Sequence, residues 1–172
     1  MTMGDQWSFK PNDNYKSTDH LIHLLVDIVA KGGNFLLNVG PQPDGTLPLA
    51  AQQRMKEMGD WLQVNGEAIY GTRPVAPYKE GQIAFTQKRG NVYAIYLPRN
   101  EGDGLPDRLT ISSFRIKPGS KVHLLGVRKP LEWEIGTGET TAIKLSRKVM
   151  EKPPCQHAFA FRFQPATNLA GN

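Results

Sequence analysis

Residues 31–45, KGGNFLLNVGPQPDG, combine the end of a helix, a short apolar run and a turn. Gly32 and Gly33 follow apolar residues at helical spacing, where helices commonly end through a left-handed residue. Residues 35–39 predict a strand. Because its apolar side chains do not alternate with polar ones, we expect cover on both faces, as in a parallel sheet with helices outside. Asn38 stands at the C-terminal end of that strand, where α/β folds place ligand-binding groups.

Two helices are predicted to flank this strand. Ser17 can N-cap the first, which begins at Thr18 and has an apolar stripe of Leu21, Leu24, Leu25, Ile28 and Val29. Pro48 suits the first turn of the second, which ends near Asn65 and has a stripe of Met55, Met58, Trp61 and Leu62. A sharp turn at Pro43-Asp44-Gly45 joins the strand to this helix. The order helix, strand, helix predicts a parallel α/β layer.

The sequence pattern changes after Thr72. Pro74 and Pro77 predict an extended linker, and short runs with strand character then recur at 83–88, 92–97, 108–111, 122–125, 131–135, 142–146 and 158–163. Hairpin or turn signals lie at 89–91 and 117–120. In the last run Phe159, Phe161 and Phe163 share one face. About seven short strands separated by turns predict an antiparallel β-sandwich.

Charge divides the chain at the same place. Residues 1–72 carry 5 Lys and Arg against 8 Asp and Glu, a net charge of −3, whereas residues 73–172 carry 16 against 8, a net charge of +8. We therefore expect two domains, 1–72 and 73–172. A basic second domain suits an anionic partner such as nucleic acid. A solvated sandwich surface is favoured instead, because the basic residues are scattered and no nucleic-acid motif accompanies them.

Several blocks of the first 72 residues, in order, closely resemble the α-L-fucosidases of glycoside hydrolase family 29. They are YKS at 15–17, LVD at 25–27, KGGNFLLNVGP at 31–41, DG at 44–45 and GEAIY at 66–70. The resemblance implies α/β plus all-β architecture, with the last strand and helices of a (β/α)8-like barrel followed by an antiparallel β-sandwich. It also implies hydrolysis of terminal α-L-fucose from fucosylated glycans, with retention of configuration through an aspartate nucleophile.

A retaining glycosidase needs two carboxyl groups about 5 Å apart. None of the eight acidic residues in 1–72 forms an apparent pair at a strand end. The resemblance places the nucleophile and the acid/base upstream of Met1, so we expect a C-terminal piece of a longer enzyme that is inactive alone. It also implies that Trp7 and Asn38, with the 40–45 loop, shape the barrel mouth and bind substrate. Trp7 could equally be a buried loop anchor.

An incomplete barrel has consequences for stability and partners. A full barrel takes roughly 250 residues, so the apolar faces of residues 1–72 are expected to lack cover and to leave this part marginal. The expected partners are fucosylated glycans and the rest of the barrel, and a homo-oligomer is left open. No cofactor is expected. His20 and His23 have a metal-like spacing without an obvious third ligand, and Cys155 is the only cysteine.

Two other function classes fit the sequence less well. The sandwich could be a non-catalytic carbohydrate-binding module, with Trp133 and Tyr93 as its aromatic residues. A nucleic-acid binder has only charge in its favour. No run of 18 apolar residues predicts a membrane span, and residues 1–10 do not resemble a signal peptide. The compartment is therefore unknown from the residues, and the family resemblance implies a periplasmic, secreted or lysosomal location.

Overall fold

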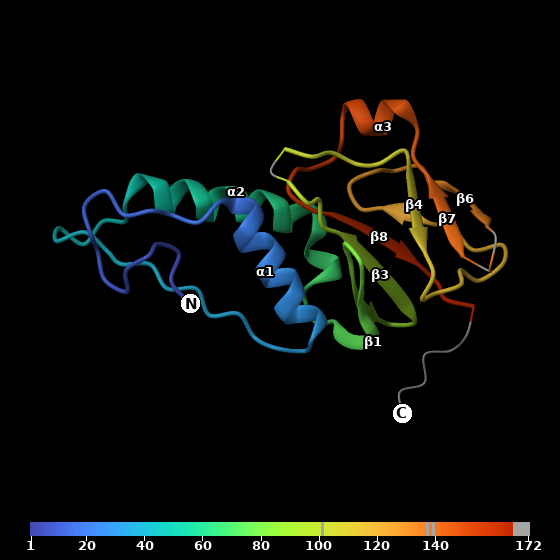
Figure 1. The fold of residues 1–172 in the computed structure, drawn as a ribbon, viewed down its shortest axis with the longest axis horizontal. Coiled ribbons are helices and arrows are strands. Elements are labelled where there is room, and N and C mark those ends of the chain that lie inside the picture. Colours follow the sequence, from blue (N-terminus) through green and yellow to red (C-terminus); the bar gives the residue numbers. More distant parts are fainter. Residues whose placement is uncertain (101, 137, 139, 167–172) are drawn as a thin grey trace.

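A computed structural model describes residues 1–100, 102–136, 138 and 140–166, arranged in three layers (Figure 1). The first layer holds helices α1 (Thr18–Ala30) and α2 (Leu49–Asn65), and the short 3-10 helix η1 (Gly66–Ala68) follows α2. A five-stranded sheet forms the middle layer and a three-stranded sheet the third. The loops before α1 and before α2 extend from the helical end of the molecule, away from the sheets.

The ends of α1 follow the predicted local signals. The Ser17 hydroxyl accepts a hydrogen bond from the His20 amide at 3.2 Å, which caps the helix N-terminus. At the other end Gly32 has φ of 81°. The amides of Gly32 and Gly33 donate to the carbonyls of Val29 and Ile28 at 2.9 Å each, the two bonds of a Schellman motif. Both predicted boundaries of this helix are confirmed.

The middle sheet has the strand order β1-β2-β3-β8-β5, and every pairing in it is antiparallel. Its strands are β1 (Arg73–Glu80), β2 (Ile83–Lys88), β3 (Asn91–Tyr96), β5 (His123–Leu124) and β8 (Phe159–Phe163). The third layer has the order β4-β7-β6, from β4 (Arg108–Ile111), β6 (Glu132–Ile135) and β7 (Thr141–Lys144). Helix α3 (Arg147–Glu151) follows β7. The predicted β-sandwich is confirmed.

The β2–β3 hairpin illustrates how a local signal fixes the register. Arg89 and Gly90 occupy the turn with φ of 50° and 76°. Two successive positive φ values define a type I′ turn, whose twist matches that of the flanking strands. Pairing then runs without a break from Lys88 opposite Asn91 to Ile83 opposite Tyr96.

The middle sheet is buried on both faces because β8 alternates large and small residues. Phe159, Phe161 and Phe163 lie in the core between the two sheets, whereas Ala158 and Ala160 lie in a second core beneath the helices. The predicted sharing of a face by the three phenylalanines is confirmed. The small alanines allow α1 and α2 to approach the sheet closely, so the sandwich covers the inner side of the helical layer.

This covering corrects the expectation that the apolar stripes of the two helices lack cover, whereas Leu36, in the 35–39 segment, is 78% exposed. Ile22, Val26, Ala30 and Trp61 are buried in the core that the helices share with the middle sheet. The buried positions of α1 are Thr18, Leu21, Ile22, Val26 and Ala30, so the predicted stripe is rotated by about one residue. On α2 the predicted inward Met55 is 38% exposed, because that turn lies beyond the edge of the sheet.

Two segments differ from their predicted secondary structure. Within the described chain, residues 35–39 are extended but form no β-ladder. Their single pairing is an isolated parallel bridge between Thr2 and Asn38. Residues 73–80, predicted as a linker, form the edge strand β1. Pro74 and Pro77 are tolerated there because an edge strand pairs on one side only. The pairing register of β1 with β2 shifts between Pro74 and Lys79, the part of the strand that contains Pro77.

Glu80, at the end of β1, joins the middle sheet to the loop after β4. Its carboxylate accepts hydrogen bonds from the Ser112 amide at 2.8 Å, the Ser113 amide at 2.8 Å and the Ser113 hydroxyl at 2.6 Å. Burial raises the pKa of Glu80, but these bonds outweigh it and leave the pKa below its ordinary value of 4.5. The ionised carboxylate therefore stabilises the sandwich.

We expect Glu80→Gln to lower the free energy of unfolding by about 1–2 kcal/mol at pH 7, since bonds to a partly solvated carboxylate are screened. Because the pKa of Glu80 is lower in the folded state, its carboxylate contributes its full stabilisation above the ordinary pKa of 4.5. That stabilisation is lost as the pH falls through the folded-state pKa. The difference between variant and parent should therefore shrink in urea titrations below that pH. Glu151→Gln, which removes an exposed ion pair with Arg147, is the control with little expected effect. An equal difference at every pH would contradict this role.

Candidate functional site

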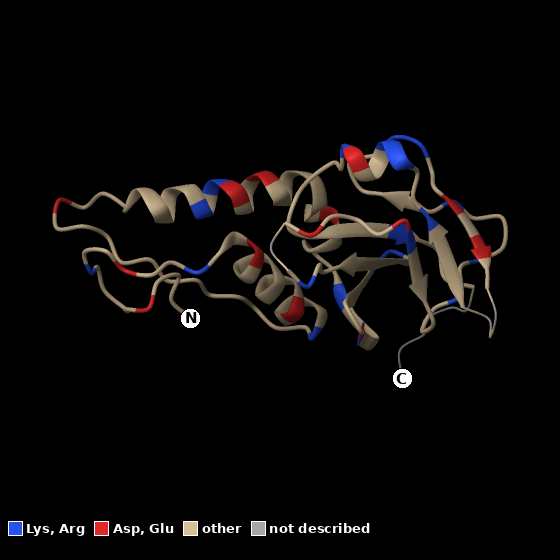
Figure 2. Cartoon of the chain, turned by 45° about the horizontal axis from the view of Figure 1, so that its top comes forward, with Lys and Arg blue, Asp and Glu red and all other residues tan. Residues whose placement is uncertain are grey.

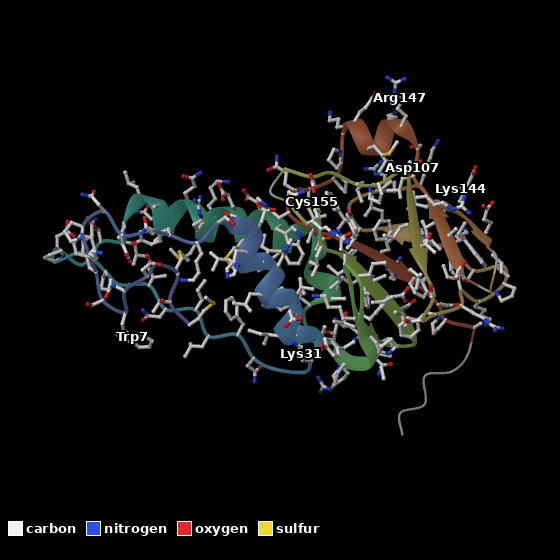
Figure 3. All side chains as sticks on the ribbon, in the orientation of Figure 1. Trp7, Lys31, Asp107, Lys144, Arg147 and Cys155 are labelled. Carbon is white, nitrogen blue, oxygen red and sulfur yellow. The ribbon has the colours of Figure 1, made fainter. Side chains whose placement is uncertain are left out.

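The two residues predicted to bind substrate lie together at the helical end of the molecule. The Asn38 amide donates from Nδ2 to the Trp7 carbonyl oxygen at 2.7 Å. The Trp7 side chain is 69% exposed and points outward, away from the sandwich (Figure 3). Its indole is therefore open to solvent, and Asn38 fixes the backbone that carries it. Their role in substrate binding stays a prediction.

The backbone holds Asn38 in place from the other side. The backbone N–H of Met3 donates to the backbone carbonyl of Asn38, and the backbone N–H of Asn38 donates to the carbonyl of Met1, both at 2.9 Å. Met3 is fully buried and packs with Leu21 and Ala51 in a small third core. Asn38 is thus held by hydrogen bonds between residues 1–3 and the loop that carries Trp7, called the Trp7 loop below. These contacts join residues more than 30 positions apart, so no local pattern could predict them.

Gly40 allows the Trp7 loop to cross the chain. A Cβ at this position would lie 2.4 Å from the Phe9 amide nitrogen and 2.6 Å from the Ser8 carbonyl carbon. Those atoms belong to the backbone and cannot move as a flexible side chain would. The sequence places Gly40 directly after the apolar run, but does not indicate which segment crosses it.

The loop after Gly40 is ordered by its own side chains. Asp44 accepts hydrogen bonds from the Thr46 amide at 3.0 Å and the Thr46 hydroxyl at 2.8 Å, and these bonds lower the pKa of Asp44. Gly45 takes φ of 85°, and its amide donates to the Gln42 carbonyl at 2.9 Å. The predicted turn is confirmed, with Asp44 as its internal anchor.

All eight acidic side chains of residues 1–72 have a partner within the fold. The acceptors and their partners are Asp5 with Asn14, Asp13 with the Gln6 amide, Asp19 with His157, Asp27 with Lys31, Asp44 with Thr46, Glu57 with Thr18, Asp60 with Lys56 and Glu67 with Tyr93. A glycosidase general acid needs a raised pKa. The hydrogen bond from Thr18 instead lowers the pKa of Glu57. Each of these carboxylates therefore has a partner within the fold, and their assignment as non-catalytic stays a prediction.

Glu67 links the first part of the chain to the middle sheet. Its carboxylate accepts a hydrogen bond from the Tyr93 hydroxyl at 2.8 Å and an ion pair from Arg162 at 2.9 Å. Burial raises the pKa of Glu67, but these two partners outweigh it and lower the pKa overall. For Tyr93, burial and the bond to Glu67 raise the pKa to about 12. The tyrosine is therefore a neutral hydrogen-bond donor at physiological pH.

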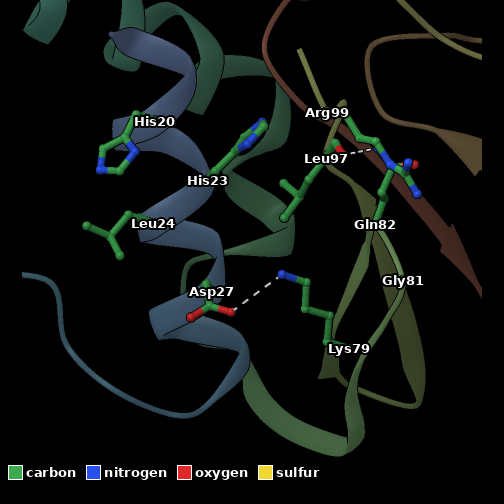
Figure 4. Close-up of a pocket in the computed structure, with 9 residues that line it drawn as sticks. All are labelled: His20, His23, Leu24, Asp27, Lys79, Gly81, Gln82, Leu97 and Arg99. Carbon is green, nitrogen blue, oxygen red and sulfur yellow. Dashed lines mark hydrogen bonds and ion pairs between the residues drawn. The ribbon is translucent and has the colours of Figure 1, made fainter. Parts of the chain in front are cut away.

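His20 and His23, whose spacing suggested a metal, border a cleft of about 410 Å³ between α1 and the start of the β1–β2 turn (Figure 4). His23 Nε2 lies 2.8 Å from the His157 carbonyl oxygen, so this ring is engaged in packing the helix onto the sandwich. His157 Nδ1 in turn lies 3.1 Å from Asp19. No cluster of three or more His, Cys, Asp or Glu suited to a metal occurs in the part of the chain described here.

Of the two aromatic residues considered for carbohydrate binding by the sandwich, Tyr93 lies in a core and Trp133 packs against one. Tyr93 is 2% exposed and belongs to the core beneath the helices. Trp133 packs against the core between the sheets, and its Nε1 donates to the Ser120 carbonyl at 3.1 Å. Tyr93 therefore offers no open ring face to a sugar, whereas Trp133 is only partly buried.

Cys155 lies where the helices meet the sandwich (Figure 3). Its thiol donates to the Ala158 carbonyl at 3.2 Å, and burial raises the pKa of the thiol to about 11. It is therefore a poor nucleophile at neutral pH.

Within the described residues, no helix is long and apolar enough to span a bilayer.

Two family models match the chain in succession. The model described as alpha-L-fucosidase matches residues 1–67, and the model described as alpha-L-fucosidase C-terminal domain matches residues 78–164. An alpha-L-fucosidase of Branchiostoma floridae is 34% identical over 92% of this chain and 36% of its own length. Human tissue alpha-L-fucosidase is 33% identical over 83% of this chain and 30% of its own length. The chain thus spans about a third of the length of these relatives.

Solved structures show the same arrangement of elements. The Thermotoga maritima alpha-fucosidase matches 94% of this chain and 38% of its own, with 29% identity and a TM-score of 0.79. The same enzyme in complex with fucose matches 93% of this chain and 38% of its own, with 29% identity and a TM-score of 0.77. The similarity covers both the helical layer and the sandwich.

Proposed function

Because the chain belongs to the α-L-fucosidase family, glycoside hydrolase family 29, we propose that it is the C-terminal portion of a retaining α-L-fucosidase that removes terminal α-L-fucose from glycans. The catalytic nucleophile and the acid/base would then lie in a part of the enzyme that this sequence does not contain. The observation that carries the proposal is the succession of the two family matches over 1–67 and 78–164, together with coverage of about a third of the relatives.

The engagement of the acidic residues supports this division of labour. A retaining glycosidase needs one carboxylate as nucleophile and a second carboxyl group with a raised pKa. In residues 1–72 the acids pair with neighbouring side chains, anchor a turn and join layers, and the pKa of Glu57 and Glu67 is lowered. The chemistry is therefore assigned to the missing strands, and this chain positions them.

Trp7 and Asn38 are proposed to shape the substrate site of the complete enzyme. An exposed indole can pack on the apolar C–H face of a sugar, and fucose carries a methyl group that extends that face. Asn38 would act through Trp7, because its Nδ2 holds the Trp7 carbonyl at 2.7 Å. Trp7 is thus the contact residue and Asn38 the positioning residue.

The rest of the barrel is the proposed partner of the helical end. Large apolar side chains remain exposed there, among them Leu36 at 78% and Leu49 at 82%. Their burial against further barrel strands and helices would stabilise both parts by the usual hydrophobic term, about 25 cal/mol per Å² of apolar surface. We place the boundary between the barrel part and the sandwich at Thr72 and Arg73.

The first test is turnover by the purified 172-residue chain on an aryl α-L-fucoside. We expect no release of the phenol above the buffer rate. Joining the unmatched upstream part of the Branchiostoma floridae relative to this chain should restore hydrolysis. Turnover by the chain alone, at a rate typical of whole glycosidases, would contradict the proposal.

The DNA sequence upstream of the Met1 codon gives an independent test. An open reading frame that encodes further barrel strands, one of them ending in an aspartate, would support the proposal. An in-frame stop directly before Met1 would oppose it and favour a barrel completed by a second chain.

In the assembled enzyme, Trp7→Ala is expected to raise KM about tenfold or more, since one lost sugar–aromatic contact of about 1.5 kcal/mol corresponds to that factor. Trp7→Phe keeps an aromatic ring and should recover most of the affinity. Asn38→Ala should give a smaller rise in KM, because it loosens the Trp7 loop without removing the ring. A KM unchanged by Trp7→Ala would show that the indole does not contact the sugar.

A further inference from the structure

A groove of about 760 Å³ lies between α3 and the loop that joins β5 to β6. Five cationic side chains line it: Arg128, Lys129, Lys144, Lys148 and Lys152. A single acidic residue, Glu132, is among the lining residues. Figure 2 shows Lys and Arg on α3 above the sandwich. Five of the 16 Lys and Arg side chains of residues 73–172 therefore meet at one concave place.

Most of this charge is not neutralised by the protein itself. Lys144 pairs with Glu134 at 2.6 Å on the adjacent strand. Arg128, Lys129, Lys148 and Lys152 have no ion-pair partner among the described residues. Lys148 lies on α3, and Lys152 directly follows the end of that helix. The groove thus carries a net positive charge that an anionic ligand would relieve.

The floor of the groove is aliphatic. Val127, Leu131, Leu145 and Val149 line it beneath the cationic rim. None of the lining residues is aromatic. Single-stranded nucleic acids are usually bound by a cationic groove combined with aromatic rings on which the bases stack. This groove has the cationic side chains but no aromatic ring for stacking. An aliphatic floor instead suits the C–H faces of a saturated ring.

The groove is remote from the proposed substrate site. Lys144 and Arg147 mark the α3 side of the sandwich in Figure 3, whereas Trp7 lies at the opposite end of the molecule. A ligand that reached both would have to be a long chain.

We propose that this groove binds a sulfated glycan and so holds a polymeric, anionic substrate at a distance from the catalytic centre. The inference rests on the proposed function for the identity of the ligand as a glycan. Sulfate is chosen over carboxylate because four uncompensated cations lie close together, and sulfation places charges more densely along a sugar chain than uronic acids do. Lys and Arg would contact the sulfate oxygens, and the aliphatic floor would contact the sugar rings.

Binding of a size-defined heparin oligosaccharide to the purified 172-residue chain tests this. Hyaluronan of equal length and a single-stranded oligonucleotide of equal charge serve as the comparison ligands. We expect the sulfated glycan to bind at least about tenfold more tightly than either, with an affinity that falls steeply between about 50 and 200 mM salt. Equal affinity for hyaluronan would overturn the choice of sulfate, and equal affinity for the oligonucleotide would overturn the choice of a glycan.

A matched pair of variants locates the site. Lys148→Glu with Lys152→Glu should weaken heparin binding about tenfold or more and reduce its salt dependence. Arg99→Glu with Lys117→Glu changes the net charge by the same amount at exposed positions outside the groove, and should change affinity by less than about twofold. Unchanged thermal unfolding of both variants ensures that the comparison concerns folded protein.

Equal losses in the two double variants would mean that net charge, not the groove, is recognised, and would overturn the proposal. No detectable binding by the parent chain would overturn it as well. The readout is binding and involves no turnover, so a failure here leaves the proposed fucosidase function standing. Conversely, an inactive assembled enzyme would not by itself remove a sulfated-glycan site.

Discussion

Trp61→Ala is expected to lower the free energy of unfolding by about 3–5 kcal/mol, the usual range for removing a buried tryptophan. Trp61 lies on α2 and is 2% exposed. Its Nε1 donates to the Ala158 carbonyl at 2.8 Å, at the start of β8. The substitution therefore opens a cavity between the helical layer and the middle sheet and also removes one of two donors to the Ala158 carbonyl, the other being the Cys155 thiol.

Two further variants separate these effects. Trp61→Phe retains much of the apolar contact but loses the hydrogen bond, so we expect a cost of about 1–3 kcal/mol. Met55→Ala, on the same helix but 38% exposed, should change the free energy of unfolding by less than about 0.5–1 kcal/mol. Urea unfolding followed by circular dichroism measures all three. A cost for Met55→Ala as large as that for Trp61→Ala would mean that α2 presents a different face to the sheet.

The Trp61 contact belongs to a polar seam that joins the two parts of the chain. Asn65 accepts a hydrogen bond from the Ala160 amide at 3.3 Å, and its Nδ2 donates to the Trp61 carbonyl at 3.2 Å. Because these bonds are buried, they fix the position of α2 along β8 as well as its distance from it. In the proposed enzyme the sandwich would thereby hold the last barrel helices in position.

Features with a short-range cause were predictable from the sequence. Ser17 caps α1, Gly32 ends it, and Arg89-Gly90 makes the β2–β3 turn, because each depends on the residue's own backbone preference or on a neighbour within four positions. The alternation in 159–163 predicted which side of β8 faces the other sheet, since a strand has a fixed period of two.

Features that depend on distant partners were not predictable. The edge strand β1 contains Pro74 and Pro77, and local preferences favour a linker there, but pairing with β2 overrides them. The apolar residues of α1 cover a wide arc, so the sequence could not decide whether Leu24 or Val26 faces inward. The position of the middle sheet decides it. At the candidate site, the exposed indole of Trp7 and its contact with Asn38 likewise arise from chain crossings that no periodicity encodes.

Gly40→Ala is expected to destabilise the site end of the molecule. The added methyl would lie 2.4 Å from the Phe9 amide nitrogen, so the Trp7 loop must move or the 35–40 segment must shift. Overpacking of this kind costs about 1–3 kcal/mol. We expect faster amide hydrogen exchange at Met3, Gln6, Lys16 and Asn38, whose amides bond within or against this loop.

Gly59→Ala is the matched control, because a Cβ at that position of α2 has no heavy atom within 4 Å. It should stabilise the helix by about 0.5–1 kcal/mol through the lower backbone entropy of alanine. The two Gly→Ala substitutions should therefore change the free energy of unfolding in opposite directions, because the chain crosses close to Gly40 and leaves space at Gly59. If Gly40→Ala left exchange at those four amides unchanged, the Trp7 loop would not be held against Gly40. The proposed placement of Trp7 by Asn38 would then lose its structural basis, because both depend on the same crossing.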